Sequence, residues 1–183
     1  MSKTSIVNIP FGTERAKTLH AGDIVELCGT IYTARDAAHL LMYESVIRNE
    51  PLPFAPDGAV IFYAGPTPKP PEKPCGAIGP TTSARMAKYA PTIFAQKIGG
   101  IIGKGLLTKD MRKSLRANRV VYFIAIGGSA ALLSKHVSDC KIIAYEHLGA
   151  EAVHELTVRN FPCIVAIDLY GADVFTSSIQ CCS

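Results

Sequence analysis

Short apolar runs recur along this chain of 183 residues, and they limit the folds that it can adopt. The runs are rich in β-branched and aromatic residues, which is typical of buried strands. They cover residues 58–65, 101–103, 120–126, 156–159 and 163–168. Helical patterns separate some of these runs, but other neighbours are joined too briefly for helical crossovers. The pattern therefore predicts an α/β fold in layers, with a mixed sheet.

The first clear strand covers residues 23–33, and Gly29 predicts a bend or a bulge within it. A helical pattern over residues 34–48 follows at once, with Thr33 in a position to cap it. Before this strand, residues 1–20 show no strong periodicity, so we expect an N-terminal arm or a short strand that crosses the domain.

Three polar residues open this helix at the end of the strand. Arg35 and Asp36 fall in the first turn, where exposed side chains reach into a cleft in many α/β proteins. His39 lies one turn beyond Arg35 on the same side of the helix. A structural interpretation is also open, in which Asp36 favours the helix dipole and His39 is a packing residue.

The length of the chain suits one domain with a well-buried core, and we expect this domain to span residues 1–183. Hydrophobic residues make up 48% of it, yet no apolar run reaches about 18 residues, so we expect no membrane-spanning helix. The N-terminal residues lack the apolar run of a signal peptide, which predicts a cytoplasmic protein. The net charge of +4 argues against a dedicated nucleic-acid-binding protein but suits a small anionic substrate.

Prolines crowd residues 65–74 and require an extended chain there, because they fix φ and lack an N–H donor. A linker between two domains is one interpretation of this segment. We favour a stiff loop within one domain, because too little chain precedes it to form a second core. Such a loop delivers Gly79 and the residues after it to a defined place.

An anion site is predicted at the sequence GPTTS, residues 79–83. Thr81 and Thr82 add hydroxyl groups to the free N–H groups of a helix N-terminus. Arg85 lies one turn inside that helix, which we expect to cover residues 83–96. A plain helix cap is the alternative interpretation of this motif.

A second part of the same site is predicted at residues 103–105, where a short strand ends in GKG. The two glycines let the backbone approach a ligand, and Lys104 adds a compact positive charge. Together the two motifs predict a pocket for a carboxylate or a phosphate.

Cations at helical spacing follow over residues 109–116, with Met111 and Leu115 on the buried side of the helix. A solvated outer face is the expected role of these cations, and contact with a polyanion is the alternative. The cations are Lys109, Arg112, Lys113 and Arg116.

Six cysteines are scattered through apolar segments, so we expect mostly buried thiols rather than a disulfide framework. None forms a Cys-x-x-Cys motif or a Cys/His cluster with metal-ligand spacing. Cys181 and Cys182 end the chain and are as typical of a frayed tail as of a ligand pair. We therefore expect this chain alone to bind no metal.

Several motifs together resemble those of one enzyme family. They are GTIYTARDAAH at residues 29–39, YAGPTP at 63–68, GPTTSARM at 79–86, GKG at 103–105 and IGGSAA at 126–131. In order and spacing they resemble the β subunit of class I fumarate hydratases and of the related L-tartrate dehydratases. The likeness extends from about residue 19 to residue 174.

This resemblance implies an iron–sulfur hydro-lyase divided between two chains. The α subunit would carry an oxygen-sensitive [4Fe–4S] cluster on three cysteines, and this β subunit, with a swivelling β/β/α fold, would complete the active site. The expected assembly is α2β2, and the expected reaction is the reversible hydration of fumarate to (S)-malate.

The resemblance also implies roles for individual residues toward a C4 dicarboxylate. Arg35 and Arg85 would bind its carboxylates, with Lys104 and Thr82 as further donors. Thr81 lies where the family places a hydroxyl implicated in proton transfer. Asp36 and His39 would support the substrate-binding residues from behind.

Two positions depart from the family pattern and leave the substrate open. Ala87 follows Arg-Met where an acidic residue is common, and Leu106 follows Lys-Gly where single-chain fumarases often have asparagine. An L-tartrate dehydratase β subunit is therefore an alternative function. A non-catalytic subunit that binds anions or acts as a scaffold is another.

Overall fold

The strands of this protein form one mixed sheet in the order β1-β2-β3-β4-β5-β7-β6. The structure is a computed structural model that describes residues 4–126 and 128–177. The first five strands pair in parallel, and β7 runs antiparallel to β5, β2 and β6. Their bounds are β1 Ser5–Ile9, β2 Ile24–Thr33, β3 Val60–Phe62, β4 Gly100–Gly103, β5 Val121–Ile124, β6 Val137–Ala144 and β7 Val153–Ile167. The predicted α/β fold with a mixed sheet is confirmed.

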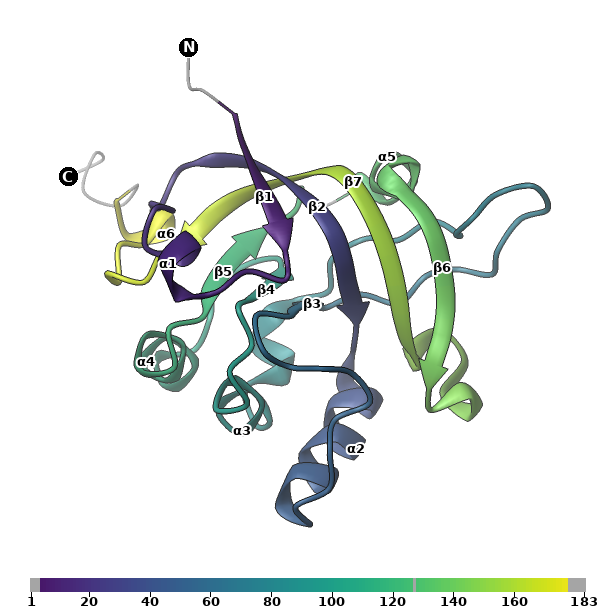
Figure 1. Ribbon diagram of the computed structural model, residues 1–183, viewed down its shortest axis with the longest axis horizontal. Coiled ribbons are helices and arrows are strands. Elements are labelled where there is room, and N and C mark those ends of the chain that lie inside the picture. The colour runs from purple at the N-terminus through teal and green to yellow at the C-terminus, as the bar shows by residue number, and fades with distance from the viewer. Residues whose placement is uncertain (1–3, 127, 178–183) are drawn as a thin grey trace.

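The sheet closes on itself because the long strand β7 pairs with both β2 and β5. With the parallel pairs β2–β3, β3–β4 and β4–β5, these contacts make a circuit of five strands. Figure 1 shows β2 and β7 arching over one side, with α2, α3 and α4 together on the other. The sheet therefore has an enclosed inner face and an outer face covered by helices.

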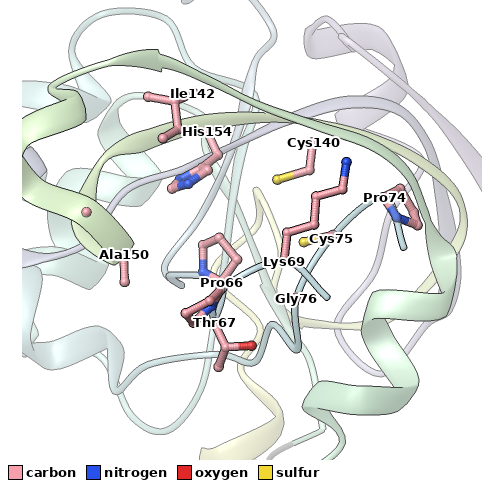
Figure 2. Close-up of a pocket in the computed structure, with 12 residues that line it drawn as sticks. Pro66, Thr67, Lys69, Pro74, Cys75, Gly76, Cys140, Ile142, Ala150 and His154 are labelled. Atoms are coloured by element: carbon pink, nitrogen blue, oxygen red, sulfur yellow. The ribbon is translucent and has the colours of Figure 1, made fainter. Parts of the chain in front are cut away.

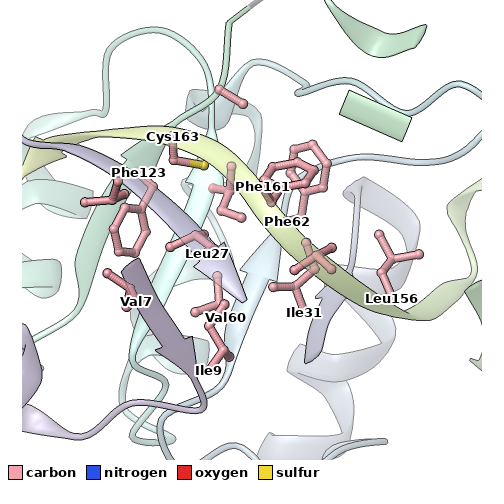
Figure 3. Close-up of a cluster of buried hydrophobic side chains, with 14 of the residues drawn as sticks. Val7, Ile9, Leu27, Ile31, Val60, Phe62, Phe123, Leu156, Phe161 and Cys163 are labelled. Atoms are coloured by element: carbon pink, nitrogen blue, oxygen red, sulfur yellow. The ribbon is translucent and has the colours of Figure 1, made fainter. Parts of the chain in front are cut away.

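Alternate residues of the central strands enter two different cores. Phe62 and Phe123 lie in the inner core, whereas their neighbours Ile61 and Tyr122 point to the helices. This alternation follows from the two-residue period of a strand, and a strand buried on both faces reads as a continuous apolar run. The inner core also takes side chains from β1, β2 and β7, as Figure 3 shows.

The outer core is covered by three helices, α2 (Asp36–Ile47), α3 (Ala90–Phe94) and α4 (Lys109–Ala117). In α4, Met111 and Leu115 are buried as predicted, and Thr108 caps the helix by accepting a hydrogen bond from the Met111 N–H. The remaining helices are short. They are α1 Thr13–Ala16, η1 Ser83–Met86, α5 Ala130–Leu133, η2 Ser134–His136, η3 Glu146–Glu151 and α6 Val174–Ser177.

The predicted irregularity at Gly29 is confirmed. The register of β2 against β7 shifts between Leu27 and Gly29, and Gly29 has a φ of 124°. A Cβ atom at this position would also collide with the carbonyl oxygen of Ile9 in β1. Gly29 therefore permits both a bulge and the close approach of the neighbouring strand.

The prediction of one helix over residues 83–96 is wrong. The segment forms the 3-10 turn η1 and then α3, which begins at Ala90. Pro91 explains the division, because it has no N–H and its ring would clash with a carbonyl in the preceding helical turn. In the first turn of α3 the missing N–H costs nothing.

The prediction of separate strands over residues 156–159 and 163–168 is also wrong, because both belong to β7. Pro162 lies within β7 opposite Glu26 of β2. The pairing of β7 with β6 ends at Val158, and its pairing with β5 begins at Ile164. Between these points no described strand pairs with this edge of β7, so a residue without an N–H breaks no ladder there.

Gly103 of β4 provides a test of how closely η1 packs on the sheet. A Cβ atom on Gly103 would collide with Ser83 Oγ and lie 3.4 Å from a Tyr63 ring carbon. We expect Gly103→Ala to lower the free energy of unfolding by about 1–3 kcal/mol, the usual cost of overpacking. Urea unfolding followed by circular dichroism measures this change.

Two comparison variants sharpen that test. Gly12→Ala adds the same methyl group where no atom lies within 4 Å, so it should cost less. Ser83→Ala combined with Gly103→Ala removes the colliding hydroxyl and should recover part of the loss. Equal stability of Gly103→Ala and the wild-type chain would contradict this packing.

Candidate active site

The predicted site residues lie at the carboxyl ends of three neighbouring parallel strands. Helix α2 begins just after β2, Tyr63 follows β3, and Lys104 follows β4. In parallel α/β sheets, both open and closed, this edge is where loops present side chains to ligands. The sequence motifs that are far apart along the chain therefore meet at one end of the sheet.

The start of α2 differs from the prediction that Thr33 caps a helix beginning at residue 34. The helix begins at Asp36, and Arg35 is its N-cap residue. Thr33 ends β2 with its hydroxyl buried, where the hydroxyl accepts from the His154 N–H at 3.0 Å. The cap prediction is wrong because the Thr33 hydroxyl bonds to the adjacent strand instead.

Glu151 of η3 supplies the carboxylate at this helix start. Its Oε2 accepts a hydrogen bond from the Ala37 N–H at 2.9 Å, and its Oε1 lies 3.6 Å from Arg35 Nη2. A carboxylate at a helix N-terminus is favoured by the helix dipole and by the free N–H groups there. Sequence reasoning missed Glu151, since no local pattern relates it to Arg35.

Asp36 and Arg85 form the second ion pair of the site. Arg85 donates from Nε to Asp36 Oδ1 at 3.0 Å, and its Nη2 lies 2.8 Å from Oδ2. The side chain of Arg85 is 49% exposed, so the pair adds about 1 kcal/mol of stability at most. The pair instead fixes the direction in which the planar guanidinium points.

The GPTTS and GKG motifs are joined by backbone hydrogen bonds. Thr81 N–H donates to the Tyr63 carbonyl at 2.6 Å, and Thr82 forms a parallel bridge with Lys104. Ser83 N–H donates to the Lys104 carbonyl at 3.0 Å. The exposed side chains of Thr82 and Lys104 thus lie on adjacent strand-like segments.

A buried pair of hydroxyl groups lies beneath the joined GPTTS and GKG motifs. Ser83 Oγ and Tyr122 Oη lie 3.0 Å apart, and Tyr122 Oη donates to the Gly105 carbonyl at 2.8 Å. Burial raises the pKa of Tyr122 to about 12, so its phenol stays protonated and remains a donor. Tyr122 and Ser83 therefore anchor the GKG turn from below.

His39 lies beneath Arg35 and is completely buried. Its Nδ1 lies 3.0 Å from the Arg35 carbonyl oxygen, and its ring meets that of Tyr63 edge to face at 5.0 Å. Burial lowers the pKa of His39 to about 4, so the imidazole is neutral near pH 7. Its Nε2, the Tyr63 hydroxyl and Arg35 Nε are buried without a hydrogen-bond partner among the described residues.

Gly65 lets Arg35 approach the chain that follows β3. A Cβ atom at Gly65 would collide with the Ala150 carbonyl oxygen and lie 3.1 Å from Arg35 Cδ. The side chain of Arg35 is therefore confined between Gly65 and η3. The YAGPTP motif contains this glycine, but its contact with Ala150 cannot be inferred from the sequence.

The donor set of the site suits an anion. Arg35, Arg85 and Lys104 are cationic, and Thr81 and Thr82 add hydroxyl groups. None of these residues is a thiol, so they do not fit the ligand set of an iron–sulfur cluster, which consists of cysteine thiolates. Within residues 4–126 and 128–177, no group of three or more His, Cys, Asp and Glu side chains could hold a metal ion.

The cysteines and the helices of the described chain bear on two further predictions. Cys75 and Cys163 are buried, Cys28 and Cys140 are partly buried, and all four are free thiols. Cys181 and Cys182 lie outside the described residues. No helix in the described part of the chain is long and apolar enough to cross a bilayer.

Comparison with known proteins gives the relatives of this chain. Residues 3–178 match the protein family described as Fumarase C-terminus. A Methanocaldococcus jannaschii protein, provisionally assigned as L(+)-tartrate dehydratase subunit beta, is 44% identical over 87% of this chain and 85% of its own length. Fumarate hydratase 2 of Leishmania major is 34% identical over 86% of this chain. The anaerobic class I fumarate hydratase of Escherichia coli is 32% identical over 85%. The chain spans only 28% and 29% of the length of these two fumarate hydratases.

The buried imidazole of His39 predicts a loss of stability in acid. Its pKa is about 4 in the folded chain, below the ordinary value of 6.5, so the unfolded chain binds the proton more tightly. The stability that neutral His39 allows is present above pH 6.5 and is lost as the pH falls toward 4. Between pH 7 and pH 5 we expect the free energy of unfolding to drop by about 2 kcal/mol from this residue.

Urea unfolding at the two pH values measures this drop, with two variants for comparison. His39→Gln should lose this part of the pH dependence, whatever its stability near pH 7. His147→Gln changes an exposed histidine and should keep it. The same slope in His39→Gln as in the wild-type chain would refute the assignment to His39.

Proposed function

This chain belongs to the Fumarase C-terminus family, and from this premise we propose that it is the β subunit of a two-chain iron–sulfur hydro-lyase. The proposed reaction is the reversible hydration of fumarate to (S)-malate. The observation that carries the proposal is the cluster of Arg35, Arg85 and Lys104 beside Thr81 at one edge of the sheet. Relatives with fumarate hydratase and tartrate dehydratase names support the hydro-lyase class.

The two arginines suit the two carboxylates of a C4 dicarboxylate. Arg85 turns its Nε and Nη2 edge toward Asp36, which leaves the Nη1 edge of the guanidinium for an incoming carboxylate. Arg35 lies too far from Glu151 for a short hydrogen bond, and its Nε has no partner among the described residues. Thr82 and Lys104 add donors on the adjacent segment.

In the direction of dehydration, the reaction removes a proton from the carbon next to one carboxylate and a hydroxide ion from the neighbouring carbon, and negative charge builds on that carboxylate. Fixed arginines stabilise this charge more than they stabilise the ground state. We assign the proton transfer to Thr81, whose N–H is tied to the Tyr63 carbonyl. A threonine hydroxyl is a weak base, so its activation requires a carboxylate, which we place on the partner subunit.

We propose that the [4Fe–4S] cluster belongs to the partner α subunit and that the enzyme is an α2β2 assembly. The absence of thiols among the site residues and the β-subunit name of the M. jannaschii relative support this division. We also place the enzyme in the cytoplasm, where thiols such as those of the four described cysteines stay reduced.

L-tartrate dehydration is the second candidate reaction. The M. jannaschii protein provisionally assigned as a tartrate dehydratase β subunit is 44% identical to this chain, compared with 34% for the L. major fumarate hydratase. Both substrates carry two carboxylates, so the same arginines suit either. L-Tartrate carries one hydroxyl group more than (S)-malate, and the substrate assay below distinguishes the two reactions.

Arg85 and Thr81 provide the variants that test the site. We expect Arg85→Ala and Thr81→Ala each to lower kcat/KM of the assembled enzyme by two or more orders of magnitude. A loss of about this size is typical when a charged hydrogen bond or a positioned proton donor is removed. Both residues are at least partly exposed, so circular dichroism should show an intact fold. Arg159→Ala, which changes an exposed arginine on β7, should leave kcat/KM unchanged. Near-normal turnover of Arg85→Ala would contradict the carboxylate assignment.

The assembled activity provides the decisive test. We expect an anaerobic mixture of this chain and a cluster-bearing partner to hydrate fumarate, while each subunit alone is inactive. L-tartrate is assayed in parallel, and a preference for it would replace the proposed substrate. After anaerobic iron and sulfide treatment, this chain alone should show no iron–sulfur absorbance, and a stoichiometric cluster on it would contradict the division between subunits.

A further inference from the structure

A cavity of about 510 Å³ separates the proline-rich loop from the β6–β7 hairpin. Pro66, Thr67 and Lys69 line it from the loop, and Cys140 and Ile142 line it from β6. Figure 2 shows the Cys75 and Cys140 sulfur atoms and the Lys69 amine directed into this space. None of these side chains has a role in the proposed hydration reaction.

The Cys75 and Cys140 thiols lie near each other in this cavity, since Cys140 packs against the inner core to which Cys75 belongs and each thiol shifts the pKa of the other. They come from segments 65 residues apart in sequence, the loop before Gly79 and the strand β6. Cys75 is buried and Cys140 is partly exposed. The two thiols therefore share one cavity, and a small solute can reach the Cys140 side.

The backbone around each thiol is held in place. Thr67 N–H donates to the Ala77 carbonyl at 3.0 Å, which joins the two arms of the proline-rich loop around Cys75. A Cβ atom on Gly76 would collide with Thr67, so the arms touch at this point. Cys140 is fixed by the pairing of β6 with Leu156 of β7. The placement of the two thiols in one cavity is thus a property of the fold.

The surroundings of the pair favour one thiolate. The neighbouring Cys75 thiol lowers the pKa of the Cys140 thiol, and so does the Lys69 ammonium, whereas burial and the Asp139 carboxylate act against this. The Cys140 thiol and burial raise the pKa of Cys75. Because Cys140 is also the more exposed of the two, it is the nucleophile of the pair and Cys75 is the resolving thiol.

We propose that Cys75 and Cys140 form a reversible disulfide when the protein meets a peroxide. The Cys140 sulfur attacks one oxygen of the peroxide, the O–O bond breaks, and the other oxygen leaves as water or an alcohol. The Cys140 sulfenic acid is then attacked by the Cys75 sulfur. The S–O bond breaks, and its oxygen leaves as water with the Cys75 proton.

In this sequence the two thiols lose two electrons, and the peroxide gains them. The reverse reaction needs a dithiol reductant, which is oxidised to its own disulfide. The new bond ties the proline-rich loop to β6. It therefore closes a long loop of chain and restricts the unfolded state.

Peptide mapping of the full chain tests this proposal. The chain is treated with hydrogen peroxide, alkylated with iodoacetamide, digested and analysed by mass spectrometry. We expect a cross-linked peptide that joins Cys75 to Cys140, the loss of both from the alkylated pool, and their return after dithiothreitol. Sulfinic acid at Cys140 with Cys75 still alkylated, or bridges that join only other cysteines, would overturn the proposal.

Variants and a stability measurement separate this bridge from general oxidation. Cys75→Ser and Cys140→Ser should each lack the cross-link, whereas Cys28→Ser should keep it, because Cys28 lies elsewhere and is hydrogen-bonded to Asn160. In the wild-type chain, the urea midpoint should rise on oxidation and return on reduction. A midpoint that does not change when the bridge forms would contradict the constraint on the loop, and this readout needs no variant.

Discussion

Hydrogen bonding along both edges of β7 is the constraint on which the rest of this structure depends. One edge pairs with β2, and the other pairs first with β6 and then with β5, so the sheet closes on itself. The closure encloses an inner core, where the rings of Phe62 and Phe161 meet at 5.5 Å. Because this face is closed, the helices cover the other face. The carboxyl ends of β2, β3 and β4 then open together at the edge that carries the charged residues.

The electrostatics of that edge follow from where its carboxylates come from. Asp36 lies at the start of α2 and Glu151 in η3, and each holds one arginine. Both pairs are only partly buried and add little to stability, so their main effect is to orient the guanidinium groups. Behind them His39 stays neutral because it is buried, and it leaves the positive charge of the site to the arginines and Lys104. Fixed cations of this kind need little reorganisation when negative charge develops on a bound carboxylate.

The thiol cavity and the candidate active site share a wall. Ala150 lines the cavity, and its carbonyl oxygen packs against Gly65, which in turn lies against the side chain of Arg35. The proline-rich loop leaves this point after Gly65 and returns through Cys75 to Thr81. Packed backbone therefore connects the loop to the segment that bears Arg35 and to the segment that bears Thr81. A change in the loop can act on both segments without a distant conformational change.

Local patterns in the sequence determined the mixed α/β class, the bulge at Gly29, the buried face of α4 and the motifs around Thr81 and Lys104. Each of these depends on residues within a few positions of one another, through strand or helix periodicity or through the backbone freedom of glycine. Only the tertiary structure decided that Glu151 pairs with Arg35, that the Thr33 hydroxyl bonds to His154 rather than capping α2, that β7 continues through Pro162, and that Cys75 and Cys140 line one cavity. These features depend on which distant segments lie side by side when the sheet closes. Closure is a property of pairing between strands, and the periodicity of a single strand does not specify its partner.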